Sequence, residues 1–548
     1  MIGTRPSGFW HFGGACSTHS PCTVSRVRAF RRGEISPLSD EADGSTSAVA
    51  SPLQGLDRAK SRMFPRSIAC GFGVHGVGHS VAVNAETYNG RLMTETTATP
   101  AEHGTRPLPR VTGPAAVRAL VELGFAAVAA GVIVRRPRVM AGLEKIQADR
   151  TAVDCVRRLR AEHGRGPVEL VIPGRRIVVI LDPEDVQRVL LESPEPFSPA
   201  NREKKAALGS FQPHAVLISE GPLREQRRLI NVAALDTTHA MHRLAQPFYA
   251  VLEQEADLLL EEALRSGSMS ADDLLIAWWR AVRRLTLGDA ARDDSLTTDL
   301  LRSLRAAGNW SFLSRPHHGK REKFIERLYE YVAQAQPGTL AAAVAELPAT
   351  AAVDPIGQMP HWLFAFDAAG IASSRALALL STHPAQEATT LAEIGDGVAG
   401  PRVLTQLRNS VMESIRLWPT TPTILRDTTA DTYWGADGSR VLTAGAAVMI
   451  QAPVFHRDPE LGDYAHRFEP DIWSDGRADA RPDLVPFSGG PASCPGQNLV
   501  LFSTSTFLAR LLARARFTLT SHHLSPGQPL PLTLNNFGLT FDVTERVT

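Results

Sequence analysis

Cysteine is scarce in this sequence, and net charge is almost absent. Five cysteines are scattered over 548 residues, and this odd, irregularly spaced set argues against a disulfide framework and for a reducing compartment. The formal net charge is +1, so the composition gives no electrostatic reason to expect nucleic-acid binding. We therefore expect a cytoplasmic protein that does not bind nucleic acid. The cysteines are Cys16, Cys22, Cys70, Cys155 and Cys494.

Long apolar runs are also missing. The best candidate, Leu123–Val134, has 12 residues without a charge. As a helix it would cover about 18 Å, against a hydrocarbon core of about 30 Å. We expect a buried or amphipathic helix there and no stable membrane insertion. The cationic pair Arg135-Arg136 that follows leaves attachment to a membrane surface as the alternative. No positively charged start leads into an apolar core, so we expect no secretory signal.

Residues 1–112 lack sustained apolar periodicity and are rich in Ser, Thr, Gly and Pro. Such a composition buries too little apolar surface to offset the entropy lost on ordering, which predicts a low-complexity, disordered extension. A transit peptide and an overextended gene start are the alternatives. Residues 113–548 would then form one large domain.

Helical periodicity dominates this domain, and strands are indicated only in short runs. Val168–Ile172 and Ile177–Leu181, separated by a Pro-Gly turn, are typical of a β-hairpin. We therefore predict a mainly α-helical fold with small β-sheets. The longest periodic stretches are Leu244–Ser266, Ala271–Thr286, Leu296–Ala307 and Lys323–Ala335.

One cysteine stands in a loop that suits a metal-binding thiolate. Cys494 lies in Phe487-Ser-Gly-Gly-Pro-Ala-Ser-Cys-Pro-Gly496, just before a long apolar helix that begins near Gln497. The positive end of the helix dipole would lower the pKa of the thiol. Gly490 and Gly496 would let the backbone approach a flat cofactor, because they carry no Cβ. The alternative is a buried structural thiol in an ordinary loop.

The spacing Phe-x-x-Gly-x-x-x-Cys-x-Gly resembles the haem-binding loop of the cytochrome P450 family. On this resemblance Cys494 is the axial ligand of the iron of haem b, in a loop shaped by Phe487, Gly490 and Gly496. Further segments resemble the same family over roughly residues 114–548. The implied fold is the family's helical prism with small sheets at one side, which encloses the haem between two helices.

Glu413-Ser-Ile-Arg416 resembles the family's Glu-x-x-Arg helix. Residues three apart share a helical face, and the resemblance implies that Glu413 and Arg416 form a structural clamp rather than a catalytic dyad. The alternative is a surface ion pair worth about 0–1 kcal/mol. The family's third partner, an Arg, is replaced by Ile472, and Arg467 is a candidate substitute. His383-Pro384 resembles the junction that precedes this helix.

Two arginines are implied to bind the haem propionates. The segment Glu220–Asn231 resembles the family's arginine-bearing helix, and we match its key residue to Arg227. Arg426, in the extended segment after the Glu-x-x-Arg helix, is the second candidate. The guanidinium fork suits a carboxylate. Two usual partners are missing, because Leu223 lies four residues before Arg227 and Ala492 lies two before the ligand.

Met359–Leu380 is predicted as a long helix and resembles the one that crosses the distal face of the haem. Its Ala-Gly370-Ile-Ala-Ser373-Ser matches the family's Ala/Gly-Gly-x-acid-Thr motif. Gly370 is expected to open the helix for oxygen, and Ser373 to replace the threonine hydroxyl. The acid, however, has become Ala372, which cannot relay a proton.

Asp367 is the candidate replacement for this acid. It lies seven residues before Ser374, about two turns, so the two share a helical face with Gly370 between them. Asp367, Gly370, Ser373 and Ser374 are therefore our candidate catalytic residues. The alternative is that Asp367 pairs with an arginine such as Arg375 and only neutralises charge.

The resemblance implies a monooxygenase that inserts one oxygen atom from O2 into a small apolar organic substrate. No flavin or dinucleotide-binding motif is evident, which implies a separate ferredoxin-type electron donor with its reductase. We expect a monomer whose donor docks near Cys494, with Arg402 and Arg408 as contacts. A peroxide-using oxygenase, or an isomerase or dehydratase, is the alternative that Ala372 motivates. A haem-binding protein without turnover is the alternative that the missing propionate partners motivate.

Overall fold

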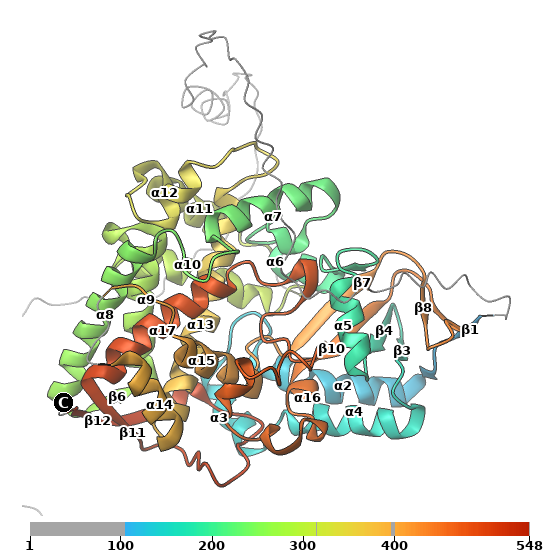
Figure 1. The fold of residues 1–548 in the computed structure, drawn as a ribbon. Coiled ribbons are helices and arrows are strands. Elements are labelled where there is room, and N and C mark those ends of the chain that lie inside the picture. The colour runs from blue at the N-terminus through green and yellow to red at the C-terminus, as the bar shows by residue number, and fades with distance from the viewer. Residues whose placement is uncertain (1–104, 314, 396–399, 547–548) are drawn as a thin grey trace, which may run out of the picture. The chain divides into compact units, whose positions relative to one another are not determined.

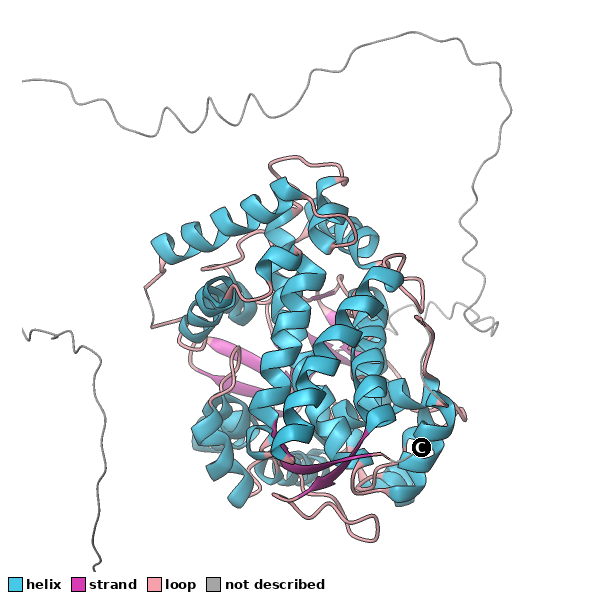
Figure 2. Cartoon of the chain, turned by 90° about the vertical axis from the view of Figure 1, so that its left-hand side faces the viewer, coloured by secondary structure: helices cyan, strands magenta, loops and turns pink. Residues whose placement is uncertain are grey.

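A computed structural model describes residues 105–313, 315–395 and 400–546 of the chain. Figure 2 shows that these residues are mostly helical and that the strands form small groups. The predicted fold class, mainly α with small β-sheets, is confirmed. The predicted extension lies outside the described residues as far as residue 104.

The largest sheet has six strands in the order β2-β3-β4-β10-β7-β5. The predicted hairpin is β3 and β4, which are antiparallel with Ile172 opposite Arg175. The central strand β10 runs parallel to β4 and antiparallel to β7, and it places Val448 opposite Arg426. The strands are β2 (Arg110–Val111), β3 (Val168–Ile172), β4 (Arg175–Val179), β5 (Phe197–Ser198), β7 (Thr423–Thr428) and β10 (Ala447–Gln451).

Two three-stranded sheets complete the β-structure of the described residues. One has the order β1-β9-β8 and the other β11-β12-β6. Their strands are β1 (Arg106–Pro107), β8 (Thr432–Trp434), β9 (Arg440–Leu442), β6 (Ser268–Ser270), β11 (Ala515–Leu519) and β12 (Thr540–Glu545).

Residues 105–112, which were predicted to be disordered, contain two short strands. Strands β1 and β2 fall within the stretch assigned to the extension, and each pairs with a strand of the domain. Leu108, between them, is buried in a cluster with Trp434 and Leu442. Short strands of two residues carry no periodicity, so the sequence alone did not reveal them.

Sixteen helices account for most of the remaining described residues. The first eight are α2 (Gly113–Ala130), α3 (Pro137–Lys145), α4 (Arg150–His163), α5 (Pro183–Leu191), α6 (Arg202–Leu208), α7 (Gly221–Leu235), α8 (Ala245–Ser266) and α9 (Ala271–Leu287). The others are α10 (Ser295–Gly308), α11 (His318–Gln334), α12 (Leu340–Ala345), α13 (Met359–Leu380), α14 (Pro384–Ile394), α15 (Thr405–Leu417), α16 (Ala452–His456) and α17 (Gln497–Arg514).

Helix α13 forms the centre of the fold. Most of its side chains are buried, and it packs against α9, α15 and α17 (Figure 1). These four helices supply much of the largest hydrophobic cluster. Any site on α13 is therefore held by a rigid frame.

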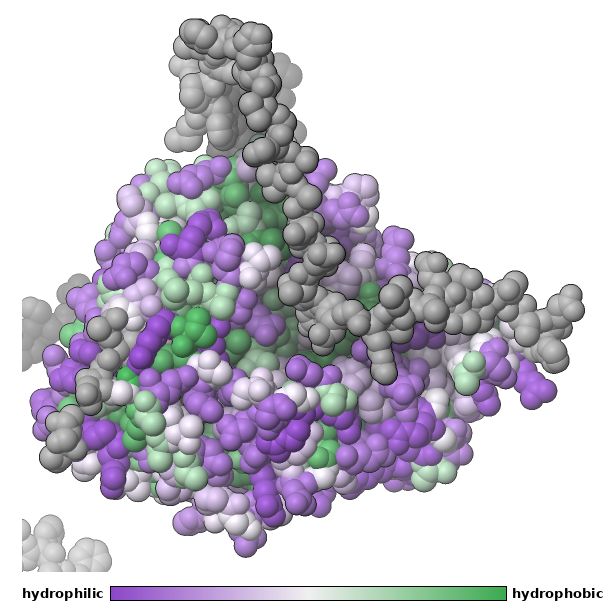
Figure 3. Space-filling model, in the orientation of Figure 1, coloured by the Kyte–Doolittle hydropathy of each residue, from purple (hydrophilic) through white to green (hydrophobic). Residues whose placement is uncertain are grey.

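Two described helices are long and apolar enough to cross a membrane by length and composition alone. One is the core helix just described, with 78% of its apolar window buried inside the fold. The other, α2, buries one face, which includes Leu123, and exposes a second apolar face that includes Val121 and Val128, so it is not the amphipathic helix that was expected. On the side of the molecule that Figure 3 shows, polar residues surround smaller apolar areas.

Candidate haem-thiolate site

The Cys494 loop folds back on itself in front of α17. The backbone N–H of Cys494 donates to the carbonyl of Phe487 at 3.0 Å, and that of Ser493 donates to the carbonyl of Gly490 at 3.0 Å. Helix α17 begins at Gln497, three residues after the cysteine. These bonds fix the sulfur at a defined place beside the start of the helix.

The expected lowering of the thiol pKa is wrong for the protein chain by itself. Burial raises the pKa of Cys494, while the N–H of Gly496 and the charge of Arg228 act in the opposite direction. A metal ion removes this obstacle, because it deprotonates a coordinating thiol outright.

The two glycines of the cysteine loop differ in why a glycine occupies the position. Gly490 has φ +63°, and a Cβ there would lie 2.1 Å from the carbonyl oxygen of Leu190, so it serves backbone packing against the end of α5. Its role in the approach to a cofactor stays a prediction. Gly496 has no such restriction, since a Cβ would meet its nearest described neighbour, Leu235, at an ordinary 3.7 Å. The expected explanation for Gly496 likewise stays a prediction.

The structure brings Glu413 and Arg416 together as a fully buried ion pair. The Nε and Nη2 atoms of Arg416 donate to the two carboxylate oxygens at 2.7 and 2.6 Å. Both side chains are 0% exposed, which excludes a surface pair. Arg416 also donates to four backbone carbonyls, those of His456, Tyr464, Ala465 and Arg467.

Glu413 is equally well satisfied. It accepts from the backbone N–H of Glu469 at 2.9 Å and from the indole N–H of Trp473 at 3.1 Å. The position of the family's third partner is Ile472, which is buried, and Arg467 contributes its carbonyl rather than its side chain. No motif in the sequence indicates Trp473, whose indole N–H supplies a donor close to the place of the missing arginine.

Arg227 is not where a propionate ligand is needed. Its guanidinium donates to the carbonyl of Ala352 at 2.6 and 3.2 Å and to the hydroxyl of Ser219 at 2.7 Å. These contacts turn it toward the segment before α13, so the structure does not bring it to the cysteine loop where a propionate ligand was predicted. Helix α7 carries three arginines within five residues, and the sequence does not distinguish them. Only the direction in which each side chain points shows which of them lie beside the cysteine loop.

Its neighbour Arg228 takes that place. The Nη1 atom of Arg228 donates to the carbonyl of Ser493 at 2.7 Å, beside Cys494. Arg224 lies one turn earlier on the same face and is 7% exposed, yet its guanidinium has no hydrogen bond to any described residue. A spacing of four between two arginines was the signal that could have identified this face.

Arg426 reaches the same place from β7. It donates to the hydroxyl of Ser193 at 3.0 Å and to that of Ser488, in the cysteine loop, at 3.4 Å. Burial, together with the charge of Arg224, lowers the pKa of Arg426 to about 10. Arg224, Arg228 and Arg426 form what we call the arginine cluster.

A fourth cation adjoins this cluster. The ammonium of Lys204 donates to the carbonyl of Leu425 at 2.9 Å, and burial and the charge of Arg426 lower its pKa well below the usual value. Among the described residues, no carboxylate hydrogen-bonds to Lys204 or to the arginine cluster. Buried cations that no carboxylate hydrogen-bonds are costly, so they fit a dianionic cofactor such as haem.

The serine hydroxyls of α13 are hydrogen-bonded within the helix itself. Ser373 and Ser374 are buried, and their hydroxyls donate to the carbonyls of Ala369 and Ile371. A Cβ on Gly370 would lie 2.6 Å from the ring of Trp278 in α9. The glycine is thus required for helix packing, and its role in opening the helix for oxygen stays a prediction.

Asp367 does not serve as expected either. Its carboxylate accepts from Nη2 of Arg305 in α10 at 2.8 Å, whereas Arg375 donates to the carbonyl of Trp418. Asp367 points about 120° away from Ser373, and Ser374, which shares its helical face, donates to the carbonyl of Ile371 and not to the Asp367 carboxylate. Asp367 is therefore a charge partner, but of an arginine that the sequence did not indicate.

Two arginines were predicted to contact the electron-donor protein, and the structure leaves only one of them at the surface. Arg408 is buried and donates to the carbonyl of Ala240, so it cannot meet a partner protein. Arg402 donates to carbonyls at the end of α14, among them that of Glu393.

Comparisons with known proteins point to one family. The family model described as Cytochrome P450 matches residues 367–539, which include Ser373, Glu413 and Cys494. Cyclooctat-9-en-7-ol 5-monooxygenase from Streptomyces melanosporofaciens is 33% identical over 147 residues, covering 25% of this chain and 31% of that protein. Cytochrome P450 714D1 from Oryza sativa subsp. japonica is 30% identical over 176 residues, covering 29% and 30%.

The chain thus spans about 30% of the length of these relatives. The crystal structure of a cytochrome P450 (CYP102L1) covers 80% of this chain and 100% of its own, with a TM-score of 0.63 and 18% identity, which extends the likeness of fold beyond the matched segment. The family model matches residues 367–539, which contain the cysteine loop, and the fold is similar to that of a cytochrome P450, so the matched part of the chain resembles the cytochrome P450 family.

Proposed function

We propose that the protein is a haem-thiolate monooxygenase that inserts one oxygen atom from O2 into an apolar organic substrate. The observation that carries this proposal is the fixed position of Cys494 beside an arginine cluster without carboxylate partners. When bound, a haem with a thiolate ligand supplies the electron density that favours O–O cleavage.

The chain's own residues have distinct tasks in this proposal. Cys494 would provide the axial sulfur, and the arginine cluster would hold the two propionates of haem b by charge-assisted hydrogen bonds. Ser373 would hold a proton at Oγ, because a hydroxyl that donates to the carbonyl of Ala369 can still accept from a water. The buried Glu413–Arg416 pair would keep the cysteine loop and α15 in register without touching substrate.

We further infer that electrons come from a separate ferredoxin-type donor with its reductase, and that the protein acts as a cytoplasmic monomer. The low cysteine content and the near-zero net charge support the compartment. Reconstitution of NADPH-dependent product formation with a ferredoxin and its reductase tests the donor. Gel filtration tests the oligomeric state.

The direct test of the site is a carbon monoxide difference spectrum of the reduced holoprotein. We expect the Soret band of a thiolate-ligated haem, and we expect Cys494→Ser to abolish it. Cys155→Ser is the matched control, because burial raises the pKa of Cys155 to about 12 and its sulfur points at the carbonyl of Ala119. Survival of the band in Cys494→Ser would overturn the proposal.

A second candidate is a peroxide-using oxygenase, or an isomerase or dehydratase of an oxygenated substrate. Two observations favour it: Ala372 replaces the relay acid, and Asp367 is engaged by Arg305. Reactions of this kind need no proton delivery for O2 reduction. Turnover with hydrogen peroxide alone, without O2-dependent product, would select this candidate.

A further inference from the structure

Helix α2 carries an exposed apolar stripe. Its exposed valines and one phenylalanine recur three or four positions apart, which places them within about 80° of the helix circumference. The opposite face of α2 packs on α4 and β3, so the core of the domain does not use this stripe. A continuous apolar stripe at the surface marks a contact with a partner. The stripe consists of Val117, Val121, Phe125, Val128 and, just after the helix, Val132, which are 39–61% exposed.

A second exposed apolar group lies beside the end of α2. It follows α10 and consists of Trp310, Phe312 and Leu313, of which Leu313 is 83% exposed. The side chain of Asn309 joins the two segments, because it accepts from the N–H of Ile133 at 2.7 Å and donates to the carbonyl of Val134 at 2.9 Å. The guanidinium of Arg136 lies 5.1 Å from the centre of the Trp310 ring. We call the stripe and these three side chains the α2 face.

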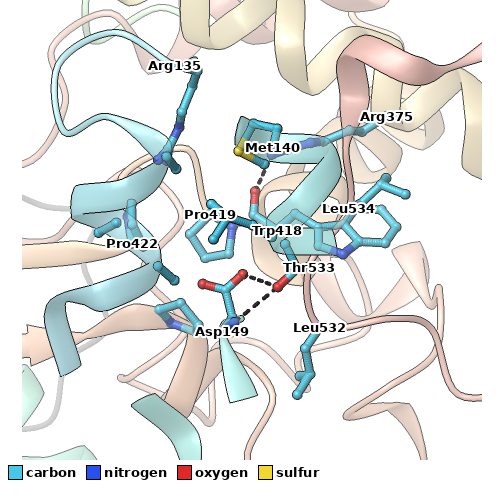
Figure 4. A pocket seen from close by; sticks show the side chains of 15 residues that line it. Arg135, Met140, Asp149, Arg375, Trp418, Pro419, Pro422, Leu532, Thr533 and Leu534 are labelled. Carbon is cyan, nitrogen blue, oxygen red and sulfur yellow. Dashed lines mark hydrogen bonds between the residues drawn. The ribbon is translucent and has the colours of Figure 1, made fainter. Parts of the chain in front are cut away.

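The turn after α2 divides its arginines between the inside and the outside of the domain. Figure 4 shows Arg135 among the side chains that line a small cavity, together with Asp149 and Arg375. Its guanidinium donates to a carbonyl between α15 and β7 at 3.0 Å, which holds the turn against the domain. Arg136 donates to carbonyls at the end of α2, and Arg138 is exposed. The turn therefore presents two of its three arginines at the border of the α2 face.

Carboxylates are missing from both segments of the α2 face. Residues 123–143 contain three arginines and no Asp or Glu, and residues 300–321 contain four arginines, one lysine and no Asp or Glu. The chain as a whole is nearly neutral, with a formal net charge of +1, so the positive charge is a local property of this surface. An apolar surface with a tryptophan and a border of arginines suits the interface of a membrane that contains anionic lipids.

The carboxylates nearest to these segments are already in ion pairs. Glu122, one residue before the first segment, accepts from Arg118 at 2.8 Å and from Arg158 at 2.5 Å. Asp367 on α13 accepts from Arg305 at 2.8 Å. Neither carboxylate is available to the arginines that follow α2.

A second copy of the chain is a poor occupant of the α2 face. In a two-fold contact a surface meets its own image. The arginines of one copy would then lie against those of the other, and neither segment supplies a carboxylate between them. Like charges that meet in this way oppose association. Lipid phosphates supply the missing negative charge, and acyl chains accept the valines and the leucine.

We propose that the α2 face docks reversibly on the surface of a membrane that contains anionic lipids. Trp310, Leu313 and the valines of α2 lie among the headgroups and the first acyl carbons, and Arg136 and Arg138 bind the lipid phosphates. Helix α2 lies along the membrane and does not cross it, because its other face belongs to the core of the domain. The proposal concerns where the protein works and does not depend on the haem chemistry.

The test is sedimentation of the full-length holoprotein with vesicles, at low and at high salt. The vesicles are phosphatidylcholine alone, or equal parts of phosphatidylcholine and phosphatidylglycerol. We expect affinity for the mixed vesicles to be about 30-fold higher at low salt, as two arginines at an anionic surface predict. High salt should remove most of this difference, because it screens exposed charges.

Two double variants locate the contact. Arg136→Gln with Arg138→Gln should reduce affinity for the mixed vesicles to that for the neutral ones. Val128→Ser with Leu313→Ser should weaken binding to both kinds of vesicle, by at least about tenfold for the mixed ones. The matched controls are Arg516→Gln on β11 and Leu258→Ser on α8, whose side chains are exposed on elements that lie apart from α2 in Figure 1. Both controls should bind like the wild type.

The proposal is overturned if the protein binds neither kind of vesicle, or binds both equally at low salt. Binding that both double variants retain would also overturn it, because another part of the chain would then meet the lipid. A dimer in gel filtration that Leu313→Ser dissociates would show that a second copy covers the face instead. If a double variant fails to fold, Arg138→Gln and Leu313→Ser alone carry the test, since both side chains are exposed. Arg138→Gln should then weaken binding about fivefold.

Discussion

Two buried arginines, Arg416 and Arg224, show how differently this fold treats the same side chain. Arg416 is 0% exposed and has a carboxylate and four carbonyls as partners. Arg224 is 7% exposed and has no side-chain hydrogen bond to a described residue. Both guanidiniums have lost most of their water, so the difference lies in what replaces it.

The closed network around Arg416 is complete within the protein. It ties α15 to the segment that precedes the cysteine loop, and nothing further is required for its stability. The arginine cluster, in contrast, has no carboxylate among its hydrogen-bond partners. It lies beside the cysteine loop, because Arg228 and Arg426 each donate to a residue of that loop. A satisfied buried charge indicates a structural role, and an unsatisfied one indicates a partner that the chain does not supply.

Removing the carboxylate from the network around Arg416 should have the largest effect on stability. Glu413→Ala leaves the Arg416 charge buried with only carbonyl partners, and we expect the free energy of unfolding to fall by about 3–5 kcal/mol. Urea titration followed by circular dichroism measures it. Glu262→Ala is the control, because Glu262 and Arg265 have the same spacing but are largely exposed, and should change stability little. Equal losses in both variants would contradict the distinction between the two regions.

Removing donors from the arginine cluster should weaken cofactor retention. Arg228→Gln and Arg224→Gln each delete a charge-assisted contact, and we expect haem affinity to fall about 10–100-fold with the fold intact. Transfer of haem to apomyoglobin measures the loss. Arg227→Gln is the matched control from the same helix and should retain the haem. If Arg227→Gln loses haem most readily, the facing of α7 that we describe is not the functional one.

Truncation shows whether residues 1–104 contribute a partner to either region. We expect a protein that begins at residue 105 to bind haem and unfold like the full chain. One that begins at residue 113 loses β1, β2 and the burial of Leu108, which is 2% exposed, and should be less stable by about 1.5–3 kcal/mol. Failure of the first truncation to bind haem would place part of the site in the N-terminal residues.

The smallest structural effect is expected on α13. Ser373→Ala should leave stability and haem content unchanged but release more peroxide per NADPH consumed, because positioned proton transfer is worth about 10²–10⁴ in rate. Asp367→Asn should leave this coupling unchanged, since Arg305 holds the carboxylate on another side of the helix. Loss of coupling in Asp367→Asn alone would restore the relay that the geometry argues against.

Local patterns carried most of the correct predictions. The β3–β4 hairpin, the long helices and the pair at positions 413 and 416 follow from periodicity and spacing, which are properties of neighbouring residues. The errors concern facing and distant contacts. Arg227, Arg228 and Arg224 differ only in which way they point, and Asp367 finds its partner 62 positions away.

The sequence by itself determined a mainly helical domain with a cysteine loop at the start of a long apolar helix, because hydrophobic periodicity and loop composition are local. Only the tertiary structure decided which arginines stand beside that cysteine and why two of the glycines are required. Gly490 is fixed by the backbone of α5 and Gly370 by the ring of Trp278, and no neighbour along the chain records either approach. Close packing brings such distant atoms together, so their roles appear only once the chain is folded.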